Sequence, residues 1–251
     1  MTHTSGLPAY ADANMLKKKY GAPNRDGLID YIAHCKRNFA PGSDMTYSCL
    51  NFITLQRIIE TVSGEDLQQY AHHHVFDVLG MKNTDYNPSK EMAKRCAPTE
   101  KQANGKCLLG YVHDPLAGIM NGGISGNAGV FTTADDVAIL CAALQNGGEW
   151  NGHRILSPLA VKAMRTVPRA RAEWGRALGW DVWSPYASNT GDLLSPETYG
   201  HTGFTGTSIV IDPVNDISII LLTNAVHPTN EGSCIALRSY VANAVAGAII
   251  K

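Results

Sequence analysis

The chain has 251 residues, with 21 basic and 22 acidic side chains and a formal net charge of −1. Hydrophobic residues make up 44% of it and charged residues 17%, a composition typical of a globular protein that buries a core. No basic stripe stands out, so we expect no nucleic-acid partner, and no apolar run approaches the roughly 20 residues that cross a bilayer.

The first two-thirds of the sequence indicate helices joined by long loops. Apolar residues recur at helical spacing in several segments, and Gly64 and Gly80 follow two of them as expected stops. The polar stretch 83–106 predicts no element. Helices are expected over 28–37, 50–63 and 65–79.

The clearest helix signal follows Thr133. Thr133 and Asp136 have the spacing of a capping box, and apolar residues then recur at i, i+3, i+4 and i+7 until Gly147 and Gly148 end the run. A short helix is expected to open at Ser157 and Pro158, an N-cap followed by proline at the first helical position.

The pattern changes near residue 177. A strand is predicted over 179–183, and β-branched runs at 208–211 and 217–223, separated by a turn, predict a hairpin. The chain ends in an amphipathic helix, whose predicted apolar face is Leu237, Tyr240, Val241, Ala244, Val245 and Ala248. The expected class is α+β, with a mainly helical lobe over 1–170 and an antiparallel sheet plus C-terminal helix over 171–251.

Three short segments carry residues suited to chemistry. They are Thr2-His3-Thr4-Ser5-Gly6-Leu7-Pro8, the stretch 41–49 that ends in Tyr47-Ser48-Cys49, and Gly200-His201-Thr202-Gly203-Phe204-Thr205-Gly206-Thr207. In this order, they resemble the serine β-lactamase and penicillin-binding-protein superfamily. The most similar branch is that of class C β-lactamases, D-alanyl-D-alanine carboxypeptidases and esterases.

The resemblance implies a β-lactamase-like fold and a site of three motifs: Ser-x-x-Lys, Tyr-x-Asn, and Lys-Thr-Gly or His-Thr-Gly. The serine forms an acyl-enzyme with an ester, amide or β-lactam carbonyl. Tyr47 matches the general base, and His201, Thr202 and Gly203 match the third motif. The Phe204 N–H is then the expected oxyanion donor, and no metal or organic cofactor is implied.

Two departures from the family pattern stand out. Cys49 occupies the position of the substrate-binding asparagine, and a thiol is a poor substitute for an amide; Asn51, two positions on, faces another side of the helix. His201 supplies less positive charge than lysine at neutral pH. Esterase or peptidase activity is therefore expected rather than efficient β-lactamase activity.

The larger departure is that no Ser, Thr or Cys in the chain is followed three positions later by Lys. The resemblance places that motif, and the first strands, upstream of the 2–8 loop, so the nucleophile helix and the N-terminal strands are expected to be missing. The isolated chain is then expected to be inactive. The last strand would have an open apolar edge, filled by a second polypeptide or by self-association, unless the chain is a fragment.

Other interpretations are open. Ser125, in Gly123-Ile124-Ser125-Gly126-Asn127, is the nearest match to a hydrolase nucleophile elbow but lacks its last glycine. Three consecutive histidines, 72–74, point in different directions on a helix and are not expected to bind one metal ion. A disulfide such as Cys96 to Cys107 remains an alternative to free thiols.

The main non-enzyme alternative is a binding module that holds cell-wall peptides or β-lactams without turnover. The compartment also stays open. As written, the chain starts without a basic and apolar leader and would stay in the cytoplasm, whereas relatives are commonly exported.

Overall fold

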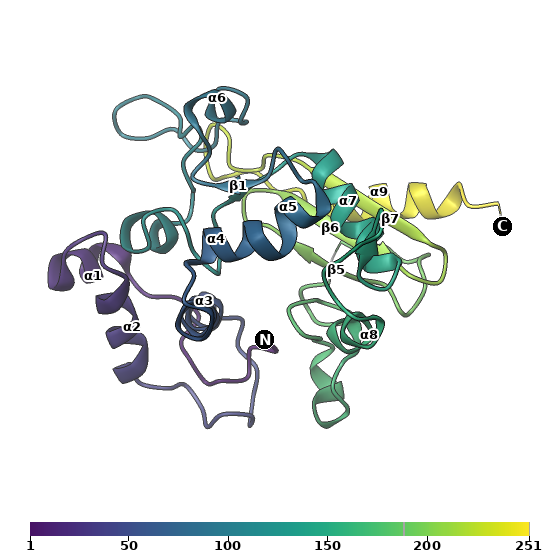
Figure 1. The fold of residues 1–251 in the computed structure, drawn as a ribbon, viewed down its shortest axis with the longest axis horizontal. Coiled ribbons are helices and arrows are strands. Elements are labelled where there is room, and N and C mark those ends of the chain that lie inside the picture. Colours follow the sequence, from purple (N-terminus) through teal and green to yellow (C-terminus); the bar gives the residue numbers. More distant parts are fainter. Residues whose placement is uncertain (188, 251) are drawn as a thin grey trace. The chain divides into compact units, whose positions relative to one another are not determined.

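A computed structural model describes residues 1–187 and 189–250 (Figure 1). Contacts between Cα atoms divide the chain into two compact units that interleave in sequence. The first unit comprises Met1–Asp77, Lys82–Pro98 and Leu108–Thr132, and the second comprises Val78–Met81, Thr99–Cys107 and the chain from Thr133 onward.

The first unit is mainly helical. Its elements are α1 (Ala13–Tyr20), α2 (Arg25–His34), α3 (Cys49–Ser63), α4 (Leu67–Ala71), the π-helical η1 (His72–Phe76), the start of α5 (Asp77–Leu79), β1 (Asp85–Tyr86), α6 (Lys90–Ala93), the π-helical η2 (Leu116–Met120) and β2 (Val130–Phe131). Strands β1 and β2 pair antiparallel.

Side-chain caps explain where these helices begin. The Asn24 carboxamide accepts from the Gly27 N–H, so α2 starts three residues before the predicted 28–37 segment. The predicted helix over 50–63 is confirmed, and Gly64 ends it in the left-handed conformation. The predicted helix over 65–79 forms after the Asp66 cap, but a π-helical turn interrupts it.

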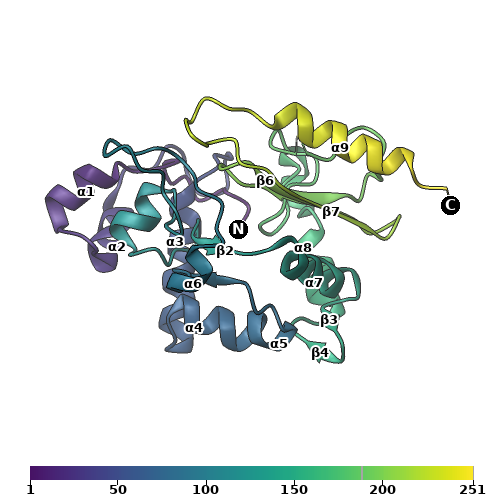
Figure 2. The ribbon, with the colours of Figure 1, turned by 90° about the horizontal axis from the view of Figure 1, so that it is seen from above.

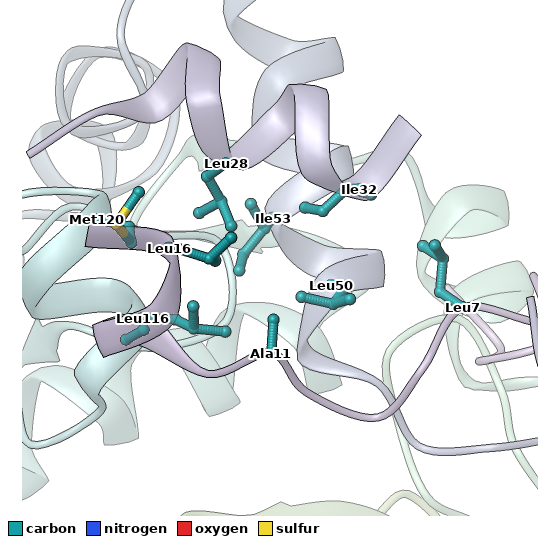
Figure 3. Close-up of a cluster of buried hydrophobic side chains, with 10 residues drawn as sticks. Leu7, Ala11, Leu16, Leu28, Ile32, Leu50, Ile53, Leu116 and Met120 are labelled. Carbon is teal, nitrogen blue, oxygen red and sulfur yellow. The ribbon is translucent and has the colours of Figure 1, made fainter. Parts of the chain in front are cut away.

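The helices of the first unit pack around a shared hydrophobic core (Figure 3). Leu16 of α1, Leu28 of α2 and Leu50 and Ile53 of α3 point toward one another, with Leu116 of η2 beside them. Each such side chain contributes roughly 1.5–3 kcal/mol when fully buried. This packing fixes the N-terminal end of α3, where Tyr47 and Cys49 lie.

The second unit contains a three-stranded sheet with helices. Its elements are the end of α5, α7 (Ala134–Gln145), β3 (Glu149–Trp150), β4 (His153–Arg154), α8 (Pro158–Arg165), the 3-10 helix η3 (Arg169–Trp174), β5 (Tyr199–Thr202), β6 (Thr207–Asp212), β7 (Ile217–Leu222) and α9 (Ile235–Gly247). The predicted helix starts at Thr133 and at Ser157 are confirmed by side-chain caps.

The sheet is antiparallel in the order β5-β6-β7, and the predicted hairpin is confirmed as β6 and β7. The strand predicted over 179–183 is wrong: this segment has only isolated bridges, in which Asp181 pairs with Gly200 and with Arg176. Within this segment, Asp181 forms a buried ion pair with Arg176, and Trp180 and Val182 pack against the hydrophobic cluster of the unit. Within the described residues, β7 is paired with β6 alone.

Helices cover both faces of this sheet, with α9 on one side and α7 on the other (Figure 2). Cys141 and Leu144 of α7 pack in one cluster with Tyr199 and Ile211 of the sheet. The segment 133–170 therefore groups with the sheet. The boundary at residue 170 between a helical lobe and a sheet region follows secondary-structure content, and it stays a prediction.

The predicted apolar face of α9 is partly wrong. Leu237 and Tyr240 are 45% and 69% exposed, whereas Arg238 and Ala242 are buried. Arg238 turns inward because its guanidinium donates to two backbone carbonyls, those of Gly203 at 3.0 Å and Thr207 at 3.1 Å. Specific hydrogen bonds, rather than the apolar stripe, thus set the rotation of this helix.

The combination of helices with an antiparallel sheet confirms the predicted α+β class. All six cysteines lie in the described ranges and have free thiols. Over residues 1–187 and 189–250, no helix has both the length and the apolarity that crossing a bilayer requires.

Candidate active site

Tyr47 lies in the loop that leads into α3, and its ring stacks on the imidazole of His3. The ring centroids are 4.3 Å apart with an interplanar angle of 27°. His3 is 2% exposed, and its φ of 60° is uncommon for a residue other than glycine. The stack links the 2–8 loop to Tyr47 and restricts the orientation of the phenol ring.

His3 is itself held by hydrogen bonds. Its Nδ1 accepts from the Ser48 N–H at 3.0 Å and from the Asn51 amide at 3.2 Å. The Ser5 hydroxyl donates to the Asn51 Oδ1. Because Nδ1 accepts, the neutral ring has its proton on Nε2. The sequence identified the 2–8 loop as part of the family pattern but did not predict that His3 would stack on Tyr47.

Cys49 is the first residue of α3. Its backbone N–H donates to the Ala9 carbonyl at 2.9 Å, and its thiol lies within hydrogen-bonding reach of the Asn127 side chain. Burial and then the Asp114 carboxylate raise the pKa of the thiol, while the Asn127 hydrogen bond acts in the opposite direction. Cys49 is therefore a neutral thiol at pH 7.

Ser125 takes part in a hydrogen-bond chain within the glycine-rich loop. Its hydroxyl accepts from the Asn121 amide at 2.6 Å and donates to the Asn127 Oδ1 at 2.7 Å. The residue is 1% exposed. These bonds support a structural role for Ser125 rather than that of a nucleophile.

His201, on β5, is hydrogen-bonded through both ring nitrogens. Nε2 faces the Arg176 guanidinium at 3.0 Å, and Nδ1 faces the Thr202 carbonyl at 2.9 Å. A guanidinium only donates and a carbonyl only accepts, so the proton of the neutral ring lies on Nδ1. Burial, followed by the charge of Arg176, lowers the pKa of His201, and the Asp181 carboxylate only partly opposes this.

A buried ion pair lies behind His201. Arg176 and Asp181 are each 1% exposed and form a salt bridge, and the Ser184 hydroxyl also donates to the Asp181 carboxylate. Neither Arg176 nor Asp181 was predicted from the sequence. The available signal was a pair of opposite charges, five positions apart, in a segment otherwise rich in apolar residues.

Hydrogen bonds hold both ends of the turn that follows His201. The Gly203 N–H donates to the Thr207 carbonyl at 2.7 Å, and Arg238 donates to the carbonyls of both residues. A Cβ on Gly203 would lie 2.3 Å from the Thr207 hydroxyl, so a larger residue here would require the Thr207 side chain to move. Thr202 is half-buried and the Phe204 side chain is 74% exposed, at the tip of the turn.

The predicted residues therefore fall into two groups. Tyr47 and Cys49 belong to the first unit, and the third-motif residues 201–204 belong to the second. Each group is held by its own buried hydrogen-bond network. The catalytic role of Tyr47 and His201, and the substrate-binding role of the others, stay predictions.

The three consecutive histidines contact carboxylates in different places. His72 pairs with Asp77 and Asp85, whereas His73 and His74 pair with Glu65. In the part of the chain that the structure describes, no three His, Cys, Asp or Glu side chains are grouped so that they could hold a metal ion.

Comparisons with known proteins bear on fold and family. A family model described as Beta-lactamase matches residues 1–242. The chain is 34% identical over 245 residues to a protein of Escherichia coli strain K12 whose name describes it as a candidate D-alanyl-D-alanine carboxypeptidase; the match covers 90% of this chain and 56% of the relative. The chain thus spans about half the length of the curated relatives that it matches.

Two solved structures are similar over most of the chain. EstCE1, described as a hydrolase with promiscuous acyltransferase activity, is 25% identical with a TM-score of 0.69, covering 96% of this chain and 69% of its own. A penicillin-binding protein from Bacillus halodurans is 19% identical with a TM-score of 0.69, covering 97% of this chain and 70% of its own. These likenesses confirm the predicted β-lactamase-like fold.

Proposed function

Because this chain belongs to the serine β-lactamase and penicillin-binding-protein superfamily, we propose that it forms the tyrosine-base and His-Thr-Gly parts of a serine-type acyl-transfer hydrolase. The single observation that carries the proposal is the preorganised Tyr47, whose ring stacks on a buried, hydrogen-bonded His3. A general base works best when its orientation is fixed before the substrate arrives.

The proposed reaction proceeds through an acyl-enzyme. Tyr47, as the phenolate stabilised by the lysine of the Ser-x-x-Lys segment, accepts the proton of the serine hydroxyl as the serine oxygen attacks the substrate carbonyl. The oxyanion accepts a hydrogen bond from the Phe204 N–H. Tyr47 then returns the proton to the leaving group, and a water molecule repeats the sequence to release the acid. His201, neutral and bonded at both nitrogens, would orient the strand rather than carry the proton.

The serine and its lysine are not among the 251 residues, which contain no Ser-x-x-Lys. We therefore propose that the chain alone is inactive toward esters, amides and β-lactams, and that a segment bearing this motif completes it. Peptide or ester substrates are favoured over β-lactams, because Cys49 and His201 replace the usual asparagine and lysine.

Covalent labelling tests the proposal. The chain is incubated with a fluorescent penicillin and a fluorophosphonate, alone and with a family segment that carries Ser-x-x-Lys joined upstream. We expect label only in the joined protein, on the serine of that segment. Tyr47→Phe should slow labelling by about 10²- to 10⁴-fold, the usual contribution of a general base. Tyr240→Phe is the matched control, because Tyr240 is 69% exposed on α9.

Label on the chain alone would contradict the proposed absence of a nucleophile. Reversible binding of penicillin, with no label on the joined protein, would instead favour the non-catalytic binding module. Equal labelling of the Tyr47→Phe and Tyr240→Phe variants would remove Tyr47 from the mechanism.

A further inference from the structure

The first unit has an amide side chain beside the position where this chain lacks the asparagine of the family pattern. Cys49 stands in place of the asparagine whose amide binds the substrate, and Asn51 is already bonded to His3 and Ser5. The Asn127 side chain, from the glycine-rich loop, lies within hydrogen-bonding reach of the Cys49 thiol. An amide is therefore present next to Cys49, although it comes from another segment of the chain.

The orientation of the Asn127 amide is set by its neighbours. Ser125 donates to the Asn127 Oδ1 at 2.7 Å, and the Ser125 hydroxyl is fixed in turn by Asn121 at 2.6 Å. Although burial raises the pKa of the Cys49 thiol, the hydrogen bond with Asn127 lowers it, as a donor to the sulfur does, so the amide Nδ2 is the group that faces Cys49. The Asn127 side chain is half-buried, so part of it is accessible to a ligand.

The loop that bears Asn127 is packed directly against α3. The Gly126 N–H donates to the Gln56 Oε1 at 3.0 Å. A Cβ on Gly126 would lie 2.1 Å from the carbonyl oxygen of Phe52, so only glycine permits this approach. The side chain next to Gly126 is consequently held at the first turn of the helix that Cys49 begins.

We propose that Asn127 replaces the missing asparagine as the donor that binds the amide carbonyl of an N-acyl peptide substrate. One Nδ2 hydrogen faces the Cys49 sulfur and the second is directed to the substrate oxygen. This inference rests on the proposed function and specifies its substrate class. It also explains how a thiol is tolerated at position 49.

The test is a binding titration of the chain with N-acetyl-D-alanyl-D-alanine, followed by NMR chemical shifts. Asn127→Ala should weaken binding about fivefold, the effect of one lost hydrogen bond. Asn127→Asp keeps the oxygen that accepts from Ser125 but removes the N–H donor, so it should weaken binding at least as much. Asn104→Ala, in an exposed loop, is the matched control and should leave the affinity unchanged.

A rescue separates a binding role from a structural one. Cys49→Asn, introduced into the Asn127→Ala variant, should restore the affinity, because the amide returns at the position the family pattern uses. Unchanged binding by Asn127→Ala and Asn127→Asp, or no rescue by Cys49→Asn, would overturn the inference alone. Failure of the unaltered chain to bind the dipeptide would also overturn the inference, whereas the proposed function is tested separately by covalent labelling of the joined protein.

Discussion

Removal of the Arg176 charge is the most informative perturbation of the second unit. Arg176→Met keeps much of the side-chain volume but leaves the Asp181 carboxylate, 1% exposed, with the Ser184 hydroxyl and without its counter-ion. Breaking one partner of a buried ion pair costs about 3–5 kcal/mol. This is a large part of the roughly 5–15 kcal/mol by which a domain is stable, but it leaves a measurable folded state.

Urea unfolding, followed through the fluorescence of Trp180 and Trp183, measures this loss. The double variant Arg176→Met/Asp181→Leu should lose less than Arg176→Met alone, since no uncompensated charge remains buried. Arg169→Met, at an exposed position, is the control and should change stability by at most about 0.5 kcal/mol. A loss below about 1 kcal/mol for Arg176→Met, or fully additive effects in the double variant, would refute the account of a tightly coupled buried pair.

Three further outcomes are expected. His201 should show the Nδ1–H tautomer in ¹⁵N NMR spectra at pH 7. Because burial lowers its pKa, its contribution to stability is complete above about 6.5 and is lost as the pH falls below that value; a titration midpoint at or above 6.5 would contradict this. Burial opposes ionisation of Asp212, but hydrogen bonds from neighbouring N–H and O–H groups outweigh it and lower its pKa to about 2. Asp212→Ala should therefore cost about 1–2 kcal/mol at pH 7, an effect that disappears in urea titrations as the pH falls from about 4 to 2. Gly126→Ala, whose Cβ meets the Phe52 carbonyl, should lower the free energy of unfolding, measured in thermal melts, by about 1–3 kcal/mol. Gly247→Ala, with open space around it, should be neutral in the same experiment.

Local sequence signals predicted the elements whose stability is local. Caps and glycine stops located α3 and the helices after Thr133 and Ser157, because the hydrogen bonds that begin and end a helix lie within a few residues. The β6–β7 hairpin was predictable for the same reason. Its β-branched runs and its turn are adjacent in the sequence.

Features that depend on distant partners were not predictable in this way. The inward face of α9 is set by Arg238, whose acceptors lie more than 30 positions earlier in the chain. The segment 179–183 resembles a strand in composition, yet it forms only isolated bridges, and its Asp181 is paired with Arg176 through contacts that composition does not reveal.

The same difference between local signals and distant contacts applies to the candidate site. Tyr47 and His201 were identified through short motifs, whereas His3, Arg176 and Asn127 were not assigned roles. Each of these three acts through a contact with a residue at least 25 positions away or in a separate segment. Short motifs locate the residues expected to meet the substrate, and the tertiary fold supplies the residues that orient them.

The two hydrogen bonds from Arg238 also affect the order in which the molecule is completed. During synthesis, β5 and β6 emerge well before residue 238, so the 203–207 turn must wait until α9 has been made before both carbonyls gain their cationic donor. Loss of α9 would thus remove hydrophobic cover from the sheet and, in the same step, release the backbone that shapes this turn.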